Sequence, residues 1–397
     1  MQPTIAFLSQ GQLFVRRPSG DPQPIESTFA QQVAERQGRQ QQANDWKGGL
    51  WDFKDGVGGP MSFGQEWEEA GEARRPVRFR SIARSPENDS IHYLLDLGGV
   101  SGIFRYDLNR DAEIRLVHRN SFPADNLTFA GDGECAVALQ KGDGTVGIAV
   151  SKTEGRHWNE ISTGDAVSLS PAFIPDERSI VFQSAPIIRD AEGFMRGIGP
   201  FAVERLELKA KCESSRLVQA DEFDHLSPRM TKSGDLYYIK RPYQISEPVT
   251  VWGRAKDVLL FPYRALMTFF AILNFFSMMF RQQPLDTVGA KRNQNRSRQH
   301  EFVAIWGRMI DTKKALSQSG TDGHLVPRDW QLIRRDTSGN ETELATNVVC
   351  FDVNEDGVLY SNGSKVFFQT HDRNTTTLWS AKLVSEVQFV PTAEQVD

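Results

Sequence analysis

A glycine motif in the stretch KGDGTVG has the spacing of a phosphate-binding loop. Gly142, Gly144 and Gly147 form the pattern G-x-G-x-x-G, which cradles a pyrophosphate when it lies between a strand and a helix. The residues that follow, IAVSKTEG, predict a strand instead of a helix. We therefore expect a hairpin turn here and no nucleotide site.

Metal-binding and nucleophilic patterns are also weak. Asp107, Asn109 and Asp111 match the start of a calcium loop, but the sixth position holds Ala112 in place of Gly and the twelfth holds His118 in place of Glu. The seven histidines form no H-x-x-x-H or H-E-x-x-H pair, and no G-x-S-x-G nucleophile elbow occurs. We predict no metal, no cofactor and no enzymatic activity.

The elements around these residues repeat one design, in which a polar turn rich in Asp and Gly is followed by an apolar strand. Asp132 and Asp176 in these turns are 44 residues apart, and Gly234 follows after 58 more. A period of about forty residues is the mark of one blade of a β-propeller. The four copies are LTFAGDGECAVALQ (127–140), LSPAFIPDERSIVFQSA (169–185), LSPRMTKSGDLYYIKR (226–241) and FDVNEDGVLYSN (351–362).

The ends of the chain complete the ring. A fifth blade is predicted within residues 77–118, and the N-terminal stretch 4–27 offers three strands, one short of a blade. The apolar strand VSEVQFV (384–390) lacks a partner of its own, and its pairing with the N-terminal strands would cover two open sheet edges. The predicted fold is an all-β, six-bladed β-propeller, one domain over residues 1–397, with helical insertions at about 27–76 and 242–329.

The repeats resemble those of the TolB-type and WD40-like propellers, whose blades carry a Ser-Pro-Asp-Gly type turn after the innermost strand. The matching stretches are AGDG (130–133), IPDE (174–177), TKSGD (231–235) and NEDG (354–357), with Ser-Pro at 170–171 and 227–228. The resemblance implies the propeller fold and, in most members, a protein-binding platform. Some members precede a serine hydrolase domain, for which this chain has no elbow motif.

Composition suits a large soluble β protein, with 39% hydrophobic residues, 32 Gly and 19 Pro. The net charge of −5 gives no reason to expect a nucleic-acid partner. Cys135, Cys212 and Cys350 form no spacing pattern, so we expect reduced, buried thiols in a cytoplasmic protein. The N-terminus shows no signal-peptide pattern.

The first insertion begins with a predicted helix, in which Ser27 or Thr28 caps and Phe29, Val33 and Ala34 share one face. A glycine-rich stretch with several aromatic residues follows. They form a candidate partner surface, and the alternative is that they fold back onto the propeller. These residues are Trp46, Trp51, Phe53, Phe63 and Trp67.

The second insertion holds the most apolar segment of the chain, residues 257–285. Sixteen residues without a charge separate Arg264 from Arg281, fewer than the roughly 20 that a membrane-spanning helix needs. The pattern predicts an amphipathic helix with a wide apolar side. That side consists of Leu266, Phe269, Ile272, Leu273, Phe276 and Phe280.

A basic cluster follows this helix and could meet anionic headgroups at about 1 kcal/mol per charge. It consists of Lys291, Arg292, Arg296 and Arg298. We predict an in-plane helix that holds the protein at the cytoplasmic face of a membrane. In the two alternatives, the apolar side packs against the propeller or a partner protein, or the segment spans the bilayer with Arg264 reaching an interface.

A second helix is predicted over residues 301–318, because Phe302, Ile305, Trp306 and Ile310 recur at helical spacing. The two predicted helices of the second insertion would project from the side of the propeller. The sequence as a whole predicts a cytoplasmic propeller scaffold that binds an unidentified protein partner, binds no nucleic acid and touches a membrane. The alternative is a hydrolase or lyase at the central channel. It requires three or more Asp, Glu, His and Arg side chains to converge there.

Overall fold

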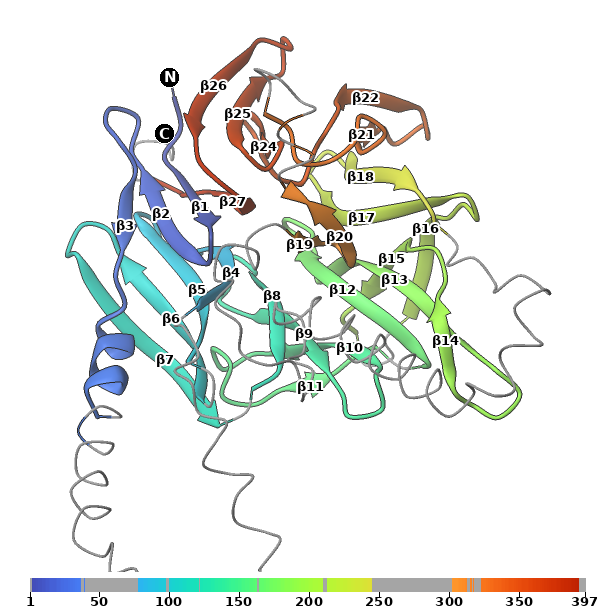
Figure 1. Ribbon diagram of the computed structural model, residues 1–397, viewed down its shortest axis with the longest axis horizontal. Helices are drawn as coiled ribbons and strands as arrows, with labels where there is room; N and C mark the ends of the chain where they lie inside the picture. The colour runs from blue at the N-terminus through green and yellow to red at the C-terminus, as the bar shows by residue number, and fades with distance from the viewer. Residues whose placement is uncertain are drawn as a thin grey trace, which may run out of the picture.

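The computed structural model describes residues 2–36, 39, 78–97, 100–120, 122–162, 164–209, 213–244, 302–312, 315, 317 and 323–392. This part of the chain is built almost entirely from antiparallel strands. In Figure 1 their sheets follow one another around a centre in chain order, from the blue N-terminal strands through green to the red C-terminal ones. The arrangement is a β-propeller.

The first two sheets have four strands each. The first has the order β27-β1-β2-β3 and contains β1 (Ile5–Ser9), β2 (Gln12–Arg16), β3 (Gln23–Ile25) and β27 (Val384–Phe389). The second contains β4 (Arg78–Arg84), β5 (Ser90–Asp96), β6 (Val100–Asp107) and β7 (Ala112–Asn120) in sequence order.

The next nine strands form one hydrogen-bonded sheet. Its first set is β8 (Ala124–Phe129), β9 (Cys135–Gln140), β10 (Val146–Ser151) and β11 (Asn159–Glu160). Its second set is β12 (Ala166–Phe173), β13 (Ser179–Arg189), β14 (Met195–Ile198), β15 (Ala202–Glu207) and β16 (Glu213–Val218). The two sets are joined by a single parallel pair between β10 and β12.

Two further four-stranded sheets and a hairpin complete the described chain. The first sheet contains β17 (Phe223–Met230), β18 (Leu236–Pro242), β21 (Gln331–Arg335) and β22 (Glu341–Ala345). The hairpin consists of β19 (Phe302–Ile305) and β20 (Arg308–Asp311). The last sheet contains β23 (Cys350–Asn354), β24 (Gly357–Ser361), β25 (Lys365–Thr370) and β26 (Thr375–Ser380).

The ring is closed by the two ends of the chain, as the sequence predicts. β27 pairs antiparallel with β1, from Ile5 opposite Phe389 to Ser9 opposite Val384. Among the described strands, the innermost ones are β27, β4, β8, β12, β17 and β23, and each lies beside the next. This ring supports the predicted number of six blades, which stays a prediction because the β10–β12 pair merges two of the sets.

Neighbouring blades are joined by hydrogen bonds that span one repeat. The side-chain oxygen of Asn126 accepts from the backbone N–H of Ser170 at 3.2 Å, and that of Gln183 accepts from Ser227 at 2.6 Å. Both pairs are 44 residues apart, the spacing that separates Asp132 from Asp176 in the sequence. The two residues of each hydrogen-bonded pair are therefore separated by one repeat length.

The core lies between adjacent sheets, so strands near the centre are buried on both faces. All six residues of β10 (VGIAVS) are buried, whereas the residues of the outermost strands β7, β11 and β26 are almost all partly or fully exposed. This explains why the second and third strands read as continuous apolar runs, while the outermost strands of the blades are polar.

The prediction of a helix over residues 301–318 is wrong for residues 302–311, which form the β19–β20 hairpin. Trp306 and Gly307 have φ angles of 48° and 76°, which suit a tight two-residue turn. This turn sets Ile305 opposite Arg308. Among the described residues of this stretch, only Thr312, Ala315 and Ser317 are helical.

Candidate interaction face and the centre of the ring

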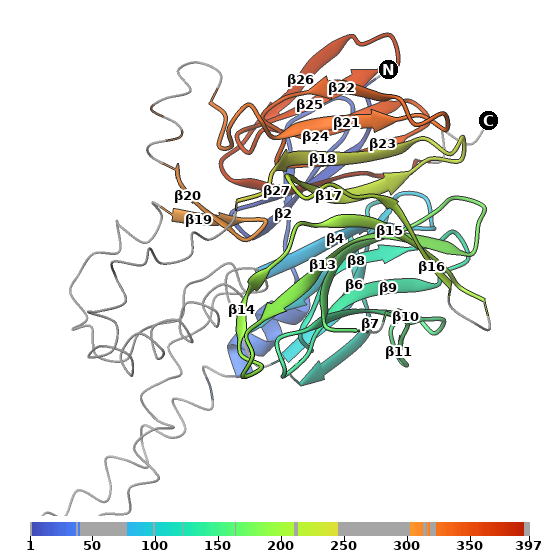
Figure 2. The same ribbon diagram turned by 90° about the vertical axis from the view of Figure 1, so that its right-hand side faces the viewer.

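The two insertions and the β13–β14 hairpin all project from one face of the propeller. This is the face at which each innermost strand begins, and the segment that connects the outermost strand of one blade to the innermost strand of the next also ends there. The first insertion, after β3, is such a segment, and the second insertion leaves β18 at Pro242, opposite the first residue of β17, Phe223. We call this side the insertion face. Figure 2 shows the helix over residues 28–36, the β13–β14 hairpin and β19–β20 on this same side.

The β13–β14 hairpin projects from the insertion face and carries exposed apolar side chains. β13 continues past its pairing with β12 and turns back at Asp190–Gly193 into β14. Ile188 is 48% exposed and Phe194 is 70% exposed, and they are the large hydrophobic residues of the described chain that are exposed. Tyr243, just after β18, donates its hydroxyl to the Ile198 carbonyl at 2.6 Å. The hairpin therefore touches the root of the second insertion.

The first insertion is anchored by a carboxylate at the start of its helix. Ser27 caps the helix as predicted, because its Oγ accepts from the Ala30 N–H at 3.1 Å. Glu113 on β7 accepts from the Ser27 and Thr28 hydroxyls and, at 2.9 Å, from the Phe29 N–H. Burial alone would raise the pKa of Glu113, but these hydrogen bonds hold it below its ordinary value. A helix N-terminus favours such an anion.

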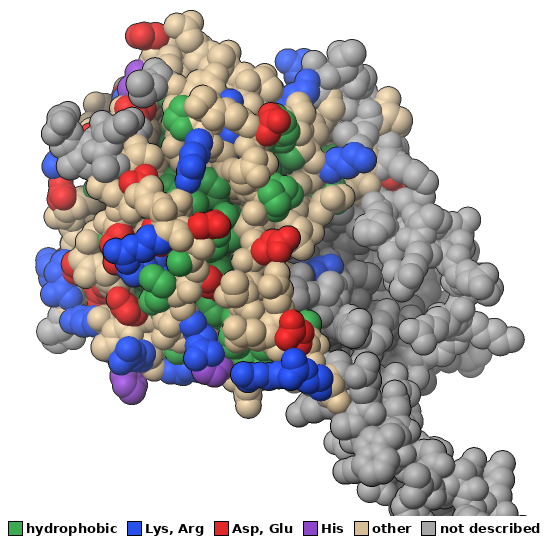
Figure 3. All heavy atoms as spheres, turned by 90° about the vertical axis from the view of Figure 1, so that its left-hand side faces the viewer, with side chains coloured by type: hydrophobic (Ala, Val, Ile, Leu, Met, Phe, Trp, Pro, Cys, Tyr) green, Lys and Arg blue, Asp and Glu red, His purple; other side chains and the backbone are tan. Residues whose placement is uncertain are grey.

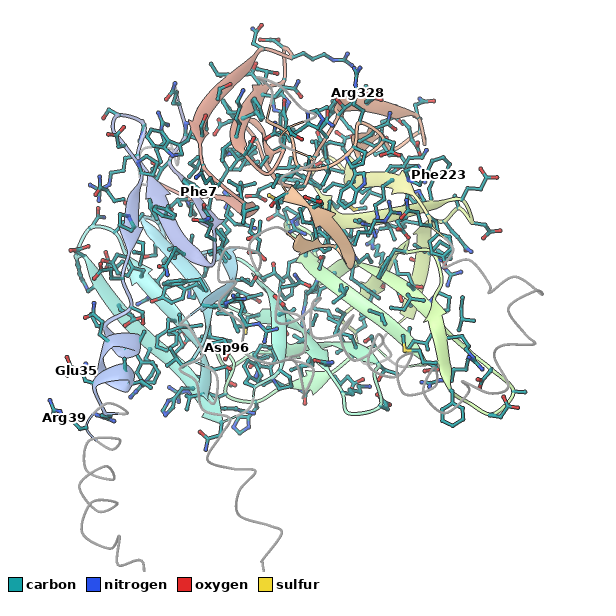
Figure 4. The ribbon with its side chains drawn as sticks, in the orientation of Figure 1. Phe7, Glu35, Arg39, Asp96, Phe223 and Arg328 are labelled. Atoms are coloured by element: carbon teal, nitrogen blue, oxygen red, sulfur yellow. The ribbon has the colours of Figure 1, made fainter. Side chains whose placement is uncertain are left out.

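The side chains of this helix divide into a packed face and an exposed one. The Phe29 ring lies 5.2 Å from the Phe104 ring, which belongs to the buried core. Glu35 and Arg39 form an exposed ion pair at 3.7 Å, and Figure 4 shows both directed away from the sheets. The helix predicted at the start of the first insertion is therefore present over residues 28–36, where the structure describes it.

A second feature of the structure is a group of ionisable side chains at the centre of the ring. Arg80 on β4 approaches Asp125 on β8 at 3.3 Å and Asp96 on β5 at 3.9 Å. Asp352 on β23 and Glu386 on β27 both act electrostatically on Arg229 of β17. Five of the six innermost strands of the described chain therefore contribute a charged residue.

Two of these carboxylates also hold the innermost strands together. Glu386 accepts from the Ile82 N–H of β4 at 2.7 Å, and Asp352 accepts from the Phe389 N–H of β27 at 2.9 Å. The closing strand β27 is thus joined by carboxylates to the blades on both sides of it.

The environment favours the neutral form of several of these acids. Burial, reinforced by Asp125, raises the pKa of Glu386 to about 8. Burial likewise raises the pKa of Asp125 to about 6, against the opposing effect of Arg80. The pKa of Asp352 is also raised by burial, with Arg229 acting in the opposite direction. The centre can therefore hold both donors and acceptors at neutral pH.

The motifs that resembled binding loops are hairpin turns, as the sequence predicts. The glycine motif lies in the turn between β9 and β10, where the Gly144 N–H donates to the Lys141 carbonyl. Asp107 is the last residue of β6, and its carboxylate accepts from the backbone N–H groups of Asn109 and Arg110 in the turn to β7, both at 3.0 Å. No group of three or more His, Cys, Asp or Glu within the described ranges is arranged to hold a metal ion.

The prediction of reduced, buried thiols can be compared with the structure for two of the three cysteines. Cys135 and Cys350 are free and buried, and burial raises the pKa of the Cys135 thiol to about 12. Both thiols are therefore protonated and unreactive at neutral pH. Cys212 lies outside the described residues.

The predicted membrane or partner contacts also lie outside the described residues. This applies to Leu266, Phe269, Ile272, Leu273, Phe276, Phe280, Lys291, Arg292, Arg296 and Arg298, and to Trp46, Trp51, Phe53 and Trp67. Within the ranges that are described, no helix combines the length and the apolar character needed to cross a bilayer.

Sequence reasoning missed Phe194 and the central acids for different reasons. Phe194 follows the turn signal DAEG (190–193), so a hairpin with an apolar residue beside its turn was readable from the sequence. Asp125, Asp352 and Glu386 lie on strands from three blades. Only the three-dimensional ring brings them together.

Comparison with known proteins identifies the fold. No family model matches the sequence, and no curated protein matches it. The structure is similar to that of TolB from Acinetobacter baumannii, with a TM-score of 0.50 and 12% identity over 98% of this chain and 67% of that one.

Two other solved structures cover the whole fold at lower similarity. A propeller in a nidogen/laminin complex has a TM-score of 0.49 and 7% identity, over 98% of each chain. A putative 6-phosphogluconolactonase from Bacteroides uniformis has a TM-score of 0.45 and 10% identity, over 98% of this chain and 99% of that one.

These observations define the class of protein as a β-propeller closed by its two chain ends. More particularly, the chain has the fold of the TolB-like β-propellers.

Proposed function

We propose that this protein is a non-enzymatic propeller scaffold that binds a protein partner through its insertion face. The observation that carries the proposal is the position of Ile188 and Phe194. These exposed apolar side chains lie on a hairpin that projects from the same face as both long insertions. Exposed aromatic residues surrounded by polar ones are typical anchors of protein interfaces.

The proposal also includes contact with an anionic membrane at the cytoplasmic face, through the apolar segment 257–285 and the basic cluster at 291–298. Its support comes from the sequence pattern, together with the position of the described residues on either side of the insertion. Tyr243 contacts the exposed hairpin, and β19 lies on the insertion face. Partner and membrane would then be engaged from one side of the propeller.

The test is capture of partners by the purified full chain, compared between two single substitutions. We expect Phe194→Ser to reduce capture of a specific partner at least tenfold, since an exposed aromatic anchor contributes about 1 to 3 kcal/mol or more. Asp372→Ser is the matched control, because Asp372 is exposed in the β25–β26 turn on the opposite face. Equal capture by both variants would refute the proposed surface.

A second candidate function, a hydrolase or lyase, is favoured by the convergence of Arg80, Asp125, Arg229, Asp352 and Glu386 at the centre of the ring. Carboxyl groups with raised pKa values beside an arginine are a recurrent feature of catalytic sites. Turnover of ester, lactone or glycoside substrates that is lost in Asp352→Asn would establish this function. Turnover that the variant retains would assign it to a contaminant.

A further inference from the structure

Hydrogen bonds join the innermost strands of the described chain at five of the six boundaries between them. In each bond a backbone N–H of one innermost strand donates to a side chain of the adjoining blade. At three boundaries the acceptor is a hydroxyl or an amide, which does not titrate at neutral pH. These acceptors are Ser81, Asn126 and Gln183, and they receive the N–H groups of Leu127, Ser170 and Ser227 in that order.

The two boundaries of the closing strand β27 differ, because their acceptors are carboxyl groups. Glu386 on β27 accepts from the Ile82 N–H of β4 at 2.7 Å, and Asp352 on β23 accepts from the Phe389 N–H of β27 at 2.9 Å. Among the described innermost strands, β27 is therefore the one whose boundary bonds on both sides end on a titratable group.

The side chain of Glu386 meets charges of both signs from neighbouring blades. Asp125 on β8 opposes its ionised form, and Arg229 on β17 favours it. Arg229 is shared with Asp352, and Asp125 is itself approached by Arg80 at 3.3 Å. Burial is the largest effect, and together with Asp125 it raises the pKa of Glu386 to about 8.

The strands that pack directly against β27 supply little further charge. β1 (IAFLS) and β24 (GVLYS) contain no Asp, Glu, His, Lys or Arg, and β25 has Lys365 as its first residue. On β4, Arg84 acts on Asp352. An ionised Glu386 therefore depends on the shared Arg229 inside the closed ring, whereas water solvates it once β27 separates.

We propose that the ring opens at the boundary between β27 and β4 as the pH rises, while the other blades stay folded. The proton on Glu386 holds this boundary closed, and its loss frees the C-terminal strand. Opening also exposes the edge of β1, with which β27 is paired. The closed ring retains the proton up to about pH 8, and the open form releases it near the ordinary pKa of 4.5. Opening therefore becomes easier between these two values and changes no further above the higher one.

Two buried cysteines report this opening in the natural chain. Cys350 on β23 belongs to the same buried cluster as Val387 and Phe389 of β27, whereas Cys135 on β9 belongs to another cluster. A thiol reagent such as dithiodipyridine reaches a buried thiol only when the surrounding structure opens. Mass spectrometry of the peptides gives the labelling rate at each thiol. The rate in the denatured chain at the same pH corrects for thiolate formation.

The protection of a thiol is its labelling rate in the denatured chain divided by that in the native one. We expect the protection of Cys350 to fall by up to about tenfold per pH unit between about pH 5 and pH 8, because opening releases one proton. At pH 8, Cys135 should be at least about tenfold better protected, since its blade stays folded. Protection of Cys350 that does not depend on pH would overturn the proposal, and so would equal protection of both thiols.

Substitutions identify the titrating group. Glu386→Gln keeps an oxygen that can accept from the Ile82 N–H but cannot ionise, so the protection of Cys350 should stay constant over this pH range. Glu355→Gln changes an exposed turn residue and is the matched control, in which the fall should persist. A fall that also persists in Glu386→Gln would refute the assignment. The pH series in the natural chain decides the proposal even where Glu386→Gln does not fold.

Discussion

Two serine residues explain why Ser-Pro recurs in the sequence. Ser170 and Ser227 both have a φ angle of 51° and lie at bulges of the innermost strands β12 and β17. At each bulge the serine N–H turns toward the preceding blade, where a side-chain amide accepts it. The proline that follows needs no ladder hydrogen bond at a bulge. The Ser-Pro dipeptide therefore marks a hydrogen-bonded joint between two blades. It lies shortly before the turn that connects the innermost strand of its blade to the second strand.

The joint at Ser227 can be tested by removing its acceptor. Gln183→Met keeps the size of the completely buried side chain but leaves the Ser227 N–H unpaired. We expect the free energy of unfolding to fall by about 1 to 3 kcal/mol in denaturant titration. Gln12→Met, at an exposed position of β2, should change little. Equal stability of both variants would show that the joint contributes nothing.

The central acids give the stability a defined pH dependence. Glu386 has a pKa raised from the ordinary 4.5 to about 8, so the folded protein retains a proton that the unfolded chain releases at lower pH. Its contribution is fully present below the unfolded pKa and is lost as the pH rises through about 8. We expect the free energy of unfolding to decrease over this window. Asp125, with a pKa of about 6, adds to the same trend.

The measurement for this prediction is chemical denaturation of the natural chain and of Glu386→Gln at several pH values. The glutamine cannot ionise, so the decrease should become shallower. Glu355→Gln changes an exposed turn residue and should leave the slope as it is. A parallel decrease in all three proteins would place the titrating group elsewhere.

At the scale of elements, the closing strand β27 is expected to control cooperativity. Its residues Val384, Val387 and Phe389 are at most 2% exposed, and its removal would also expose the edge of β1. Deletion of residues 384–397 should therefore lower the melting temperature by many degrees and broaden the transition. Deletion of 393–397 alone is the control. A long deletion that melts like the natural chain would contradict the role of this strand in closure.

The elements also show what the sequence could and could not reveal. The turn residues at 130–134, 141–145 and 231–235 were sufficient to predict hairpins there. The strand at 384–390, which has no partner nearby in the sequence, was sufficient to predict that the two chain ends pair and close the ring. The stretch 302–311 misled, because its apolar residues fit a helix as well as a strand and the turn at Trp306–Gly307 decides between them. The hydrogen bond from Ser27 to Glu113 joins residues that are 86 positions apart in the sequence. A local sequence pattern therefore could not predict it.

At the scale of the whole molecule, the two faces and the rim differ in character. One face consists of short hairpin turns, whereas the insertion face carries the long excursions and the exposed Phe194. On the side of the rim shown in Figure 3, acidic and basic side chains are interspersed, in keeping with a net charge of only −5. Specific contact is therefore expected from the insertion face.

The basic cluster provides an electrostatic test of the membrane proposal. Neutralising Lys291, Arg292, Arg296 and Arg298 should weaken binding to anionic vesicles by at most about 1 kcal/mol per charge, with a smaller loss at high salt. Neutral vesicles should bind both proteins equally. Binding that depends on neither lipid charge nor salt would leave this cluster without a role at the membrane.

The apolar segment provides the hydrophobic test. Replacing Phe269, Phe276 and Phe280 by Ser removes three aromatic side chains, each worth roughly 1.5 to 3 kcal/mol when it is fully buried. If they lie in a lipid interface, the protein should move from the membrane pellet to the supernatant of fractionated cells and keep its melting temperature. If they pack on the propeller instead, the melting temperature should fall and fractionation should stay the same. This second outcome would exclude the membrane proposal and leave the partner surface around Phe194 as the function of the insertion face.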